Sequence, residues 1–244
     1  PEATVINDDI RNVSGKQLLR SSRLKSSEKD NLIILACPPC QGFSSARRNS
    51  QRQSDPRNLL VLEFVRLVEE IKPVAFVMEN VPGLANRIGH EVLDLAIQRL
   101  KNAGYMITEP KVLEAIQYGV PQKRKRLVMM GTRLKSVNLS IPIPKYRKPD
   151  EEDSNLPKYK TVQDYIHDLP KISAGSKSST DALHVAASLS ETNLKRLIHT
   201  PHNGGDRLSW PDDLVLDCHK NKKGHTDVYG RMRWDSPSPT ITGG

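Results

Sequence analysis

Residues 31–45 read NLIILACPPCQGFSS, a nearly continuous apolar run that enters a loop containing Cys37 and Cys40. An apolar run of this length predicts a buried strand at residues 32–36, with helices covering both faces. Amphipathic segments separate it from similar runs, so the first 131 residues predict an α/β fold, a parallel sheet covered by helices. The other predicted strands are residues 3–7, 74–78 and 126–131.

Two segments between the predicted strands have the apolar spacing of amphipathic helices. Apolar residues recur at helical spacing from Leu59 to Ile71, and Pro73 ends that run. A second helix is predicted at residues 91–103, where Gly104 closes it. We expect both apolar stripes to form the core.

The character of the chain changes near Ser136. Prolines at 142, 144, 149 and 157 interrupt any long element, and residues 184–225 carry five of the seven histidines. Loop-rich segments of this kind favour a binding surface over a core. We therefore predict two domains, residues 1–135 and residues 136–244, of which the second is small and irregular.

Composition narrows the functional classes. The chain has 244 residues and a formal net charge of +9, which suits a polyanionic partner such as nucleic acid but also ordinary solubility. No apolar run approaches the roughly 18 residues of a membrane span, so we expect no membrane association. Three cysteines, an odd count without a signal peptide, indicate a reducing compartment.

Cys40 allows three interpretations. With Cys37 it forms a Cys-x-x-Cys pair, which is found in thioredoxin-like redox proteins and in halves of zinc sites. Cys40 also lies in the loop after a predicted strand, and ligands of open α/β sheets bind at the carboxyl ends of the strands. A thiolate is a strong nucleophile, so the third interpretation is that Cys40 attacks a bound ligand. Glu79 follows the predicted strand at 74–78 and is the candidate acid, although capping a helix or pairing with an arginine would also explain it.

Basic residues gather in two places. Residues 117–126, QYGVPQKRKR, precede a predicted strand, and alternation along that strand would set Arg124 and Arg126 on one face. A solvated basic edge strand is the alternative. Four arginines that suit phosphate recognition follow the Cys40 loop, unless they are simply solvated: Arg47, Arg48, Arg52 and Arg57.

Four motifs follow one another in the chain: PPCQGFS at 38–44, DPRN at 55–58, MENV at 78–81 and QKRKR at 122–126. In order and spacing they resemble the cytosine-5 DNA methyltransferases over roughly residues 5–131. The resemblance implies a Rossmann-like S-adenosylmethionine-dependent methyltransferase fold. Its sheet would be mixed or parallel with helices on both faces, and a small target-recognition domain would follow.

The resemblance also implies roles for the site residues. Cys40 would attack carbon 6 of a flipped-out cytosine, so that carbon 5 takes the methyl group of S-adenosylmethionine. Glu79 would bind and protonate the ring nitrogen N3, Arg126 would hold the base, and Arg124 would support the same site. Gln41 and Ser44 would lie on the loop that fills the gap in the duplex.

The resemblance also implies contacts with S-adenosylmethionine. Asp9 and Ile10 would lie beside its adenine ring, and Pro39 and Leu60 would pack next to that ring. The glycine-rich cofactor loop of the family has no counterpart, because the sequence contains no Gly-x-Gly. The last two family motifs are absent as well, so we expect sequence to be missing at both ends. No metal site is expected.

Double-stranded DNA is the expected substrate. Residues 199–242 resemble the family's target-recognition region and the segment after it, which makes Arg231 and Arg233, with Arg47 and Arg57, candidate DNA contacts. Residues 42–44, Gly-Phe-Ser, differ from the Pro-Phe-Thr typical of the RNA-methylating branch. We expect a monomeric bacterial modification enzyme of a restriction-modification system, located in the cytoplasm at the nucleoid.

Two other classes of function remain open. A degenerate relative that binds DNA without catalysis is compatible with the missing cofactor loop. A thiol-disulfide oxidoreductase that uses Cys37 and Cys40 is the third hypothesis.

Overall fold

The computed structural model describes residues 3–39, 59–86, 89–151, 155–220 and 230–241. The chain divides into two compact units. The first contains residues 1–114 and 125–143, and the second contains residues 115–124 and 144–244. The second unit thus includes the ten residues that precede the last strand. The domain boundary expected after residue 135 stays a prediction.

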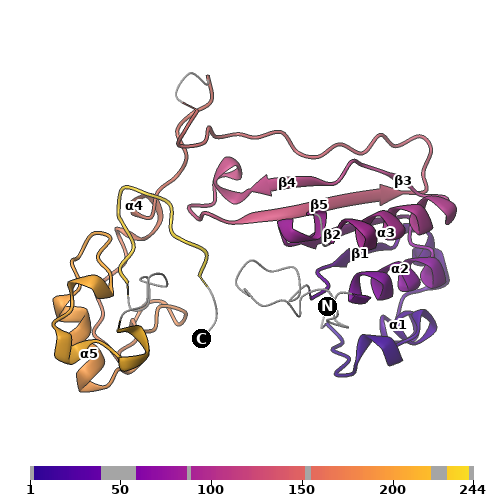
Figure 1. Cartoon of the computed structure of the whole chain (residues 1–244). Coiled ribbons are helices and arrows are strands. Elements are labelled where there is room, and N and C mark those ends of the chain that lie inside the picture. The colour runs from indigo at the N-terminus through magenta and orange to yellow at the C-terminus, as the bar shows by residue number, and fades with distance from the viewer. Residues whose placement is uncertain (1–2, 40–58, 87–88, 152–154, 221–229, 242–244) are drawn as a thin grey trace. The chain divides into compact units, whose positions relative to one another are not determined.

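A five-stranded mixed sheet forms the centre of the first unit (Figure 1). The order is β1-β2-β5-β3, and β4 also pairs with β5. The strands β1 and β2 are parallel, whereas β5 is antiparallel to β2, β3 and β4. The strands are β1 (Ile33–Ala36), β2 (Ala75–Asn80), β3 (Met106–Ile107), β4 (Lys111–Glu114) and β5 (Lys125–Thr132).

The connections explain why the sheet is mixed and not wholly parallel. The helix α2 (Leu60–Ile71) lies in the crossover from β1 to β2, and crossovers of this kind join parallel strands. Only residues 115–124 connect β4 to β5, so the chain turns back and the two strands pair antiparallel. The purely parallel alternative was therefore wrong.

The strand predicted at residues 3–7 is also corrected. These residues form no strand, and β1 ends the path of paired strands. A strand exists through pairing of its backbone groups, and β-forming side chains alone do not supply the partner. Three of these residues, Ala3, Thr4 and Ile6, instead line a cavity.

The two predicted helices are confirmed with small shifts at their ends. The helix α2 ends where Lys72 takes a left-handed φ of 54°, directly before Pro73. The helix α3 (His90–Asn102) ends before Gly104, whose φ is +89°. Pro and a left-handed residue therefore mark the helix ends, as the sequence indicates.

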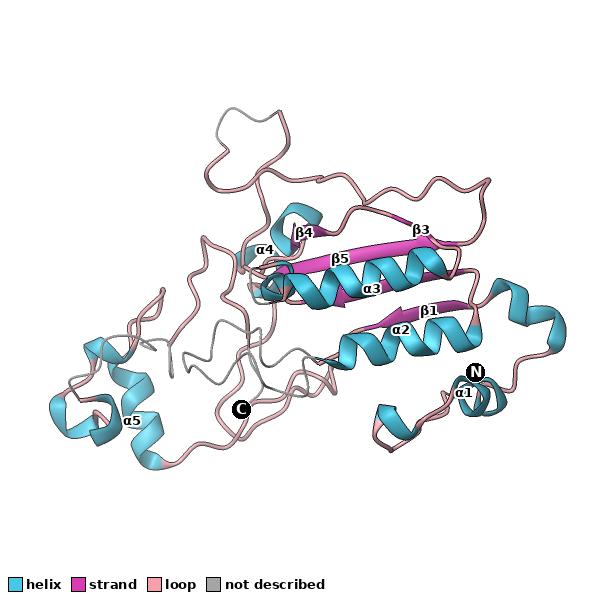
Figure 2. Ribbon diagram, turned by 45° about the vertical axis from the view of Figure 1, so that its right-hand side comes forward, coloured by secondary structure: helices cyan, strands magenta, loops and turns pink. Residues whose placement is uncertain are grey.

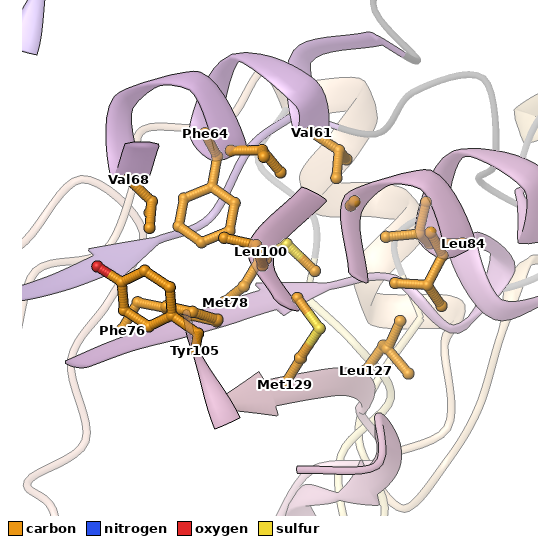
Figure 3. Packing of buried hydrophobic residues seen from close by; sticks show 13 residues of the cluster. Val61, Phe64, Val68, Phe76, Met78, Leu84, Leu100, Tyr105, Leu127 and Met129 are labelled. Carbon is orange, nitrogen blue, oxygen red and sulfur yellow. The ribbon is translucent and has the colours of Figure 1, made fainter. Parts of the chain in front are cut away.

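The core lies between the sheet and the helices α2 and α3 (Figures 2 and 3). Along β2 every second residue is buried, and β5 alternates in the same way up to Met130. Ile33 and Leu35 of β1 are 56% and 77% exposed, so among the described residues no helix covers that face of β1. The buried cluster consists of Val61, Phe64, Val65, Val68, Phe76, Met78, Leu84, Leu93, Ala96, Leu100, Tyr105, Leu127 and Met129.

The described part of the second unit is mostly loops and single turns. Its helices are α4 (Gln163–Ile166) and α5 (Glu191–His199), and three 3-10 turns follow α5. At the end of α5, the indole Nε1 of Trp210 donates a hydrogen bond to Thr200 Oγ1 over 2.8 Å. Among the helices of the described chain, none has the length and apolar character of a membrane span.

Candidate active site

Parts of three motifs lie at one edge of the sheet: Pro38 and Pro39, residues 78–80, and Lys125 with Arg126. Because β1 and β2 are parallel neighbours, the chain leaves both at the same edge, into Cys37-Pro38-Pro39 and past Glu79. The antiparallel β5 begins there, with Leu127 opposite Asn80 and Val128 opposite Glu79. The strand ends thus bring together residues that lie more than 40 positions apart in the sequence.

Glu79 and Arg126 form an ion pair at this edge. The distance from Arg126 Nε to Glu79 Oε1 is 2.7 Å, and the side chains are 24% and 33% exposed, arginine first. Arg126 Nη1 also donates a hydrogen bond to the carbonyl of Lys125 over 2.7 Å. The pair is therefore fixed by the sheet but remains accessible to a ligand. It presents an acid and a fork of N–H donors on one side of the sheet.

Asn80 holds the loop that leads to Cys40. It is 2% exposed, its Nδ2 donates to the carbonyl of Pro38 over 3.1 Å, and its Oδ1 accepts from the backbone N–H of Val81 over 2.8 Å. The sequence motifs alone assign Asn80 no role. The alternation that buries Phe76 and Met78 also buries position 80, and a buried amide needs hydrogen-bond partners, so that signal was available.

Several predicted site residues lie outside the described residues: Cys40, Gln41, Ser44, Arg47 and Arg57. Their roles stay predictions, and so does the redox interpretation of Cys40. Cys37, the other half of that pair, is an exposed free thiol. Within the described ranges, no three His, Cys, Asp or Glu side chains gather as a metal site would require.

Arg124 belongs to the second unit, so its expected place beside Glu79 stays a prediction. The backbone before it pairs with residues 238–240. Lys123 N donates to Ser238 O, Ser238 N donates to Pro121 O, and both distances are 2.8 Å. The hydroxyl of Thr240 donates to Lys123 O over 2.7 Å. Residues near the end of the chain therefore hold the segment that leads into β5.

Arg231 and Arg233 already have partners within the chain. The guanidinium of Arg231 donates to the carbonyls of Leu197 and Thr200 at 3.0 and 3.1 Å, where α5 ends. Arg233 pairs with Asp235 over 3.0 Å, and this hydrogen-bonded partner lowers the pKa of the Asp235 carboxyl. Arg231 therefore stabilises the second unit through backbone acceptors, and DNA contact by either arginine stays a prediction.

A cavity of about 700 Å³ lies between the N-terminal segment, β1 and α2. Ile10, Pro39 and Leu60 all line it, so three of the four predicted cofactor residues share one space. The fourth, Asp9, precedes Ile10, and its carboxylate accepts hydrogen bonds from Arg11, which lower its pKa to about 2. Other apolar residues of the lining are Ile6, Leu18, Leu19, Ile34, Phe64 and Leu67.

This cavity suits the adenosine part of S-adenosylmethionine. Pockets for ligands of that size measure about 300–1,000 Å³ and are mostly apolar with a few polar groups. Here apolar side chains from α2 and the N-terminal segment form the walls. The charged carboxylate of Asp9, next to the wall residue Ile10, is an acceptor for hydroxyl or amino donors.

Two known proteins are similar to this chain over nearly its whole length. The chain is 34% identical over 239 residues to the Type II methylase M.HgiDII of Herpetosiphon aurantiacus, covering 97% of this chain and 62% of that protein. It is 32% identical over 244 residues to the Type II methyltransferase M1.HphI of Haemophilus parahaemolyticus, covering 100% and 59%. The chain thus spans about three fifths of the length of both relatives.

A solved structure described as a DNA modification methyltransferase encoded within an E. coli prophage has the same fold. The TM-score is 0.57 at 22% identity, with 96% of this chain and 68% of that chain covered. The model of the C-5 cytosine-specific DNA methylases matches residues 2–241. Because this family model covers nearly the whole chain, which also carries four family motifs in order, the chain belongs to the C-5 cytosine-specific DNA methylase family.

Proposed function

We propose that this chain carries the catalytic part of a DNA cytosine-5 methyltransferase, which transfers a methyl group from S-adenosylmethionine to a flipped cytosine in duplex DNA. The observation that carries the proposal is the Glu79–Arg126 ion pair. It lies at the edge where the chain passes through Pro38 and Pro39 toward Cys40. A nucleophile, an acid and a base-holding guanidinium would then face one reacting ring.

The side chains divide the chemistry between them. The Cys40 thiolate forms a bond to carbon 6 of the cytosine, which makes carbon 5 nucleophilic, and Glu79 offsets the charge that builds up at N3. S-adenosylmethionine, when bound, supplies the methyl group on a positively charged sulfur. Loss of the proton from carbon 5 and departure of the Cys40 thiolate then release 5-methylcytosine.

Arg126 and Asn80 position the reacting groups of the site. Arg126 orients the carboxylate of Glu79 from 2.7 Å and retains N–H donors for the base. Asn80 ties the carbonyl of Pro38 to the end of β2, so the Cys40 loop begins from a fixed point. A nucleophile positioned in this way reacts faster because less orientational freedom is lost at the transition state.

The cavity beside α2 supports S-adenosylmethionine as the cofactor. Ile10, Pro39 and Leu60 would pack against its adenine ring, and Asp9 would accept hydrogen bonds next to it. Pro39 lines the cavity and is followed directly by Cys40. The donor would therefore bind next to the loop that carries the nucleophile.

Duplex DNA is the proposed substrate of the site. The formal charge of +9 favours a polyanion, and neutralising phosphates would make binding salt-dependent. The Type II relatives favour a bacterial modification enzyme. That it is monomeric and acts at the nucleoid is part of the proposal. Candidate DNA contacts are Gln41, Ser44, Arg47, Arg57, Arg231 and Arg233.

The decisive experiment measures transfer of labelled methyl from S-adenosylmethionine to duplex DNA. Cys40→Ser should abolish transfer but leave DNA binding intact, since an alcohol is a far weaker nucleophile than a thiolate. Cys218→Ser is the matched control, because Cys218 is an exposed free thiol in the second unit. Transfer by Cys40→Ser at the wild-type rate would overturn the assignment.

Other outcomes distinguish the alternatives. Tight DNA binding with no methyl transfer by the wild-type protein would favour a non-catalytic relative. Disulfide exchange that requires both Cys37 and Cys40, without methyl transfer, would favour the oxidoreductase.

A further inference from the structure

The side chain of Arg66, on α2, joins two parts of the first unit. Its Nε and Nη1 pair with Glu63 and Glu70 of the same helix, each at 2.7 Å. Its Nη2 donates to the backbone carbonyls of Ile10 and Val13, each at 2.9 Å. Two carboxylates therefore aim the guanidinium at a segment more than 50 residues earlier in the chain.

Glu70 completes the attachment. Its Oε2 accepts a hydrogen bond of 2.6 Å from the backbone N–H of Gly15, and its Oε1 accepts from Arg66. These contacts, the one from Gly15 first, lower the pKa of the Glu70 carboxyl. At Gly15 a Cβ atom would lie 2.8 Å from Ile71 Cγ1, so only glycine permits this approach. The segment is thus fastened to α2 at three backbone positions.

The attached segment forms one wall of the cavity described above. Asp9 caps the 3-10 turn Ile10–Asn12, and Ile10 lines the cavity. After Gly15 the chain continues into α1 (Gly15–Ser21), which lies beside α2 (Figures 1 and 2) and contributes Leu18 to the same cavity. The position of this wall relative to α2 therefore depends on Arg66.

We propose that Arg66 is a positioning residue for the cofactor. By holding the carbonyls of Ile10 and Val13, it fixes Ile10 in the cavity wall, with Asp9 directly before it, and sets the affinity for S-adenosylmethionine without touching it. This inference rests on the proposed function, which assigns the cavity to that cofactor. Without the guanidinium, the segment must be ordered when the cofactor binds, and that ordering lowers affinity.

Arg99 provides a matched control, because it also pairs with a carboxylate of α2. It joins α3 to Glu69 of α2 through two hydrogen bonds, with the Nε bond at 3.0 Å. Its side chain is 34% exposed, compared with 27% for Arg66. Its carboxylate partner Glu69 lies on α2, so loss of Arg99 removes a similar ion pair without releasing residues 9–15.

The experiment compares Arg66→Met, Arg66→Lys and Arg99→Met in the purified protein. Calorimetric titration gives the Kd of S-adenosylmethionine, gel shift gives the Kd of duplex DNA, and steady-state assays give kcat and KM. For Arg66→Met we expect the Kd and KM of S-adenosylmethionine to rise about tenfold, with kcat and the Kd of DNA within about twofold of wild type. Arg66→Lys should be intermediate, because an ammonium cannot replace the forked donors.

Arg99→Met should lower the melting temperature by a similar amount but change the Kd of S-adenosylmethionine less than about twofold. An unchanged Kd in Arg66→Met, or an equal rise in Arg99→Met, would overturn the proposal. If Arg66→Met does not fold, Glu70→Gln tests the same attachment through the weakened Gly15 contact. Failure of the wild-type protein to bind S-adenosylmethionine would instead refute the cofactor assignment itself.

Discussion

The interior of each unit is stabilised by a different kind of interaction. In the first unit, a continuous cluster of buried apolar side chains joins α2 and α3 to the sheet. In the described part of the second unit, the buried residues include the polar or charged Thr200, Arg207 and Ser238 as well as a few apolar residues such as Trp210. Hydrogen bonds from side chains to backbone carbonyls, such as those of Arg231, contribute more to the stability of this unit.

This difference is consistent with the tasks that we propose for the two units, catalysis in the first and DNA recognition in the second. A packed interior holds reacting groups to within fractions of an ångström. Loops held by hydrogen bonds can change in sequence with little effect on a core, which suits a surface that recognises DNA. We therefore expect substitutions in the first unit to affect chemistry and global stability, and substitutions in the second unit to act locally.

The largest effect is expected on catalysis at the sheet edge. Glu79→Gln keeps the shape of the side chain but removes its acid, so kcat should fall about 10²- to 10⁴-fold. Glu114→Gln, which removes the partner of Lys125 on neighbouring strands, is the control and should stay near wild type. Single-turnover methyl transfer separates the two variants, and equal rates would show that the acid role is wrong.

The next effect concerns the core of the first unit. Phe76 is fully buried and packs edge-on against Phe64, with ring centroids 5.4 Å apart. Phe76→Ala should lower the free energy of unfolding by about 3–5 kcal/mol, because it leaves a cavity. Leu95→Ala, at a residue that is 43% exposed on α3, should cost less than about 1 kcal/mol. Denaturant unfolding measures both, and similar losses would contradict the described core.

A smaller effect is expected in the second unit. Trp210→Phe removes the hydrogen bond to Thr200 but keeps most of the ring, so the cost should be about 1–2 kcal/mol. Hydrogen exchange should show faster opening of residues in and after α5, while the sheet of the first unit keeps its protection. Trp234→Phe, at a residue that is 39% exposed, serves as the control. Loss of protection throughout the sheet would show that the units do not respond separately.

The smallest effect is a pH dependence at the attachment of residues 10–15. Folding lowers the pKa of Glu70 from its usual 4.5, first through the Gly15 N–H and then through Arg66. A carboxyl of this kind contributes stability above its unfolded pKa and loses that contribution as the pH falls through the lower folded pKa. Stability should therefore decrease as the pH falls below about 4.5, and Glu70→Gln should weaken that decrease.

The exposed Asp235 of the second unit offers the comparison for that measurement. Its pKa is also lowered, by Arg233, but the pair lies at the surface. Asp235→Asn should therefore change the acid limb less than Glu70→Gln does, because solvent screens exposed pairs. Thermal melts of both variants between pH 3 and pH 7, about the range in which carboxyls titrate, are the measurement. They show which variant changes the acid dependence of stability more. A larger effect of Asp235→Asn than of Glu70→Gln on stability at low pH would contradict this prediction.

Much of the fold could be predicted because its signals are local. The apolar spacing of residues 59–71 and the stop at Pro73 specify α2, and the short apolar runs specify β1, β2 and β5. The prediction failed at residues 3–7, where β-forming side chains lack a partner strand, and in the direction of β5. Both depend on pairing between distant segments, which residue preferences do not encode.

The candidate site divides in the same way. The sequence by itself determined the residue types and their order, so the family resemblance could predict Glu79, Arg126 and the cavity residues Ile10, Pro39 and Leu60 as site residues. Only the tertiary structure decided that Arg126 contacts Glu79, that Asn80 holds Pro38, and that Arg66 holds residues 10–15. Local patterns follow from bonds and preferences over a few residues, whereas these contacts exist only once the core has packed and brought distant polar groups within hydrogen-bond range.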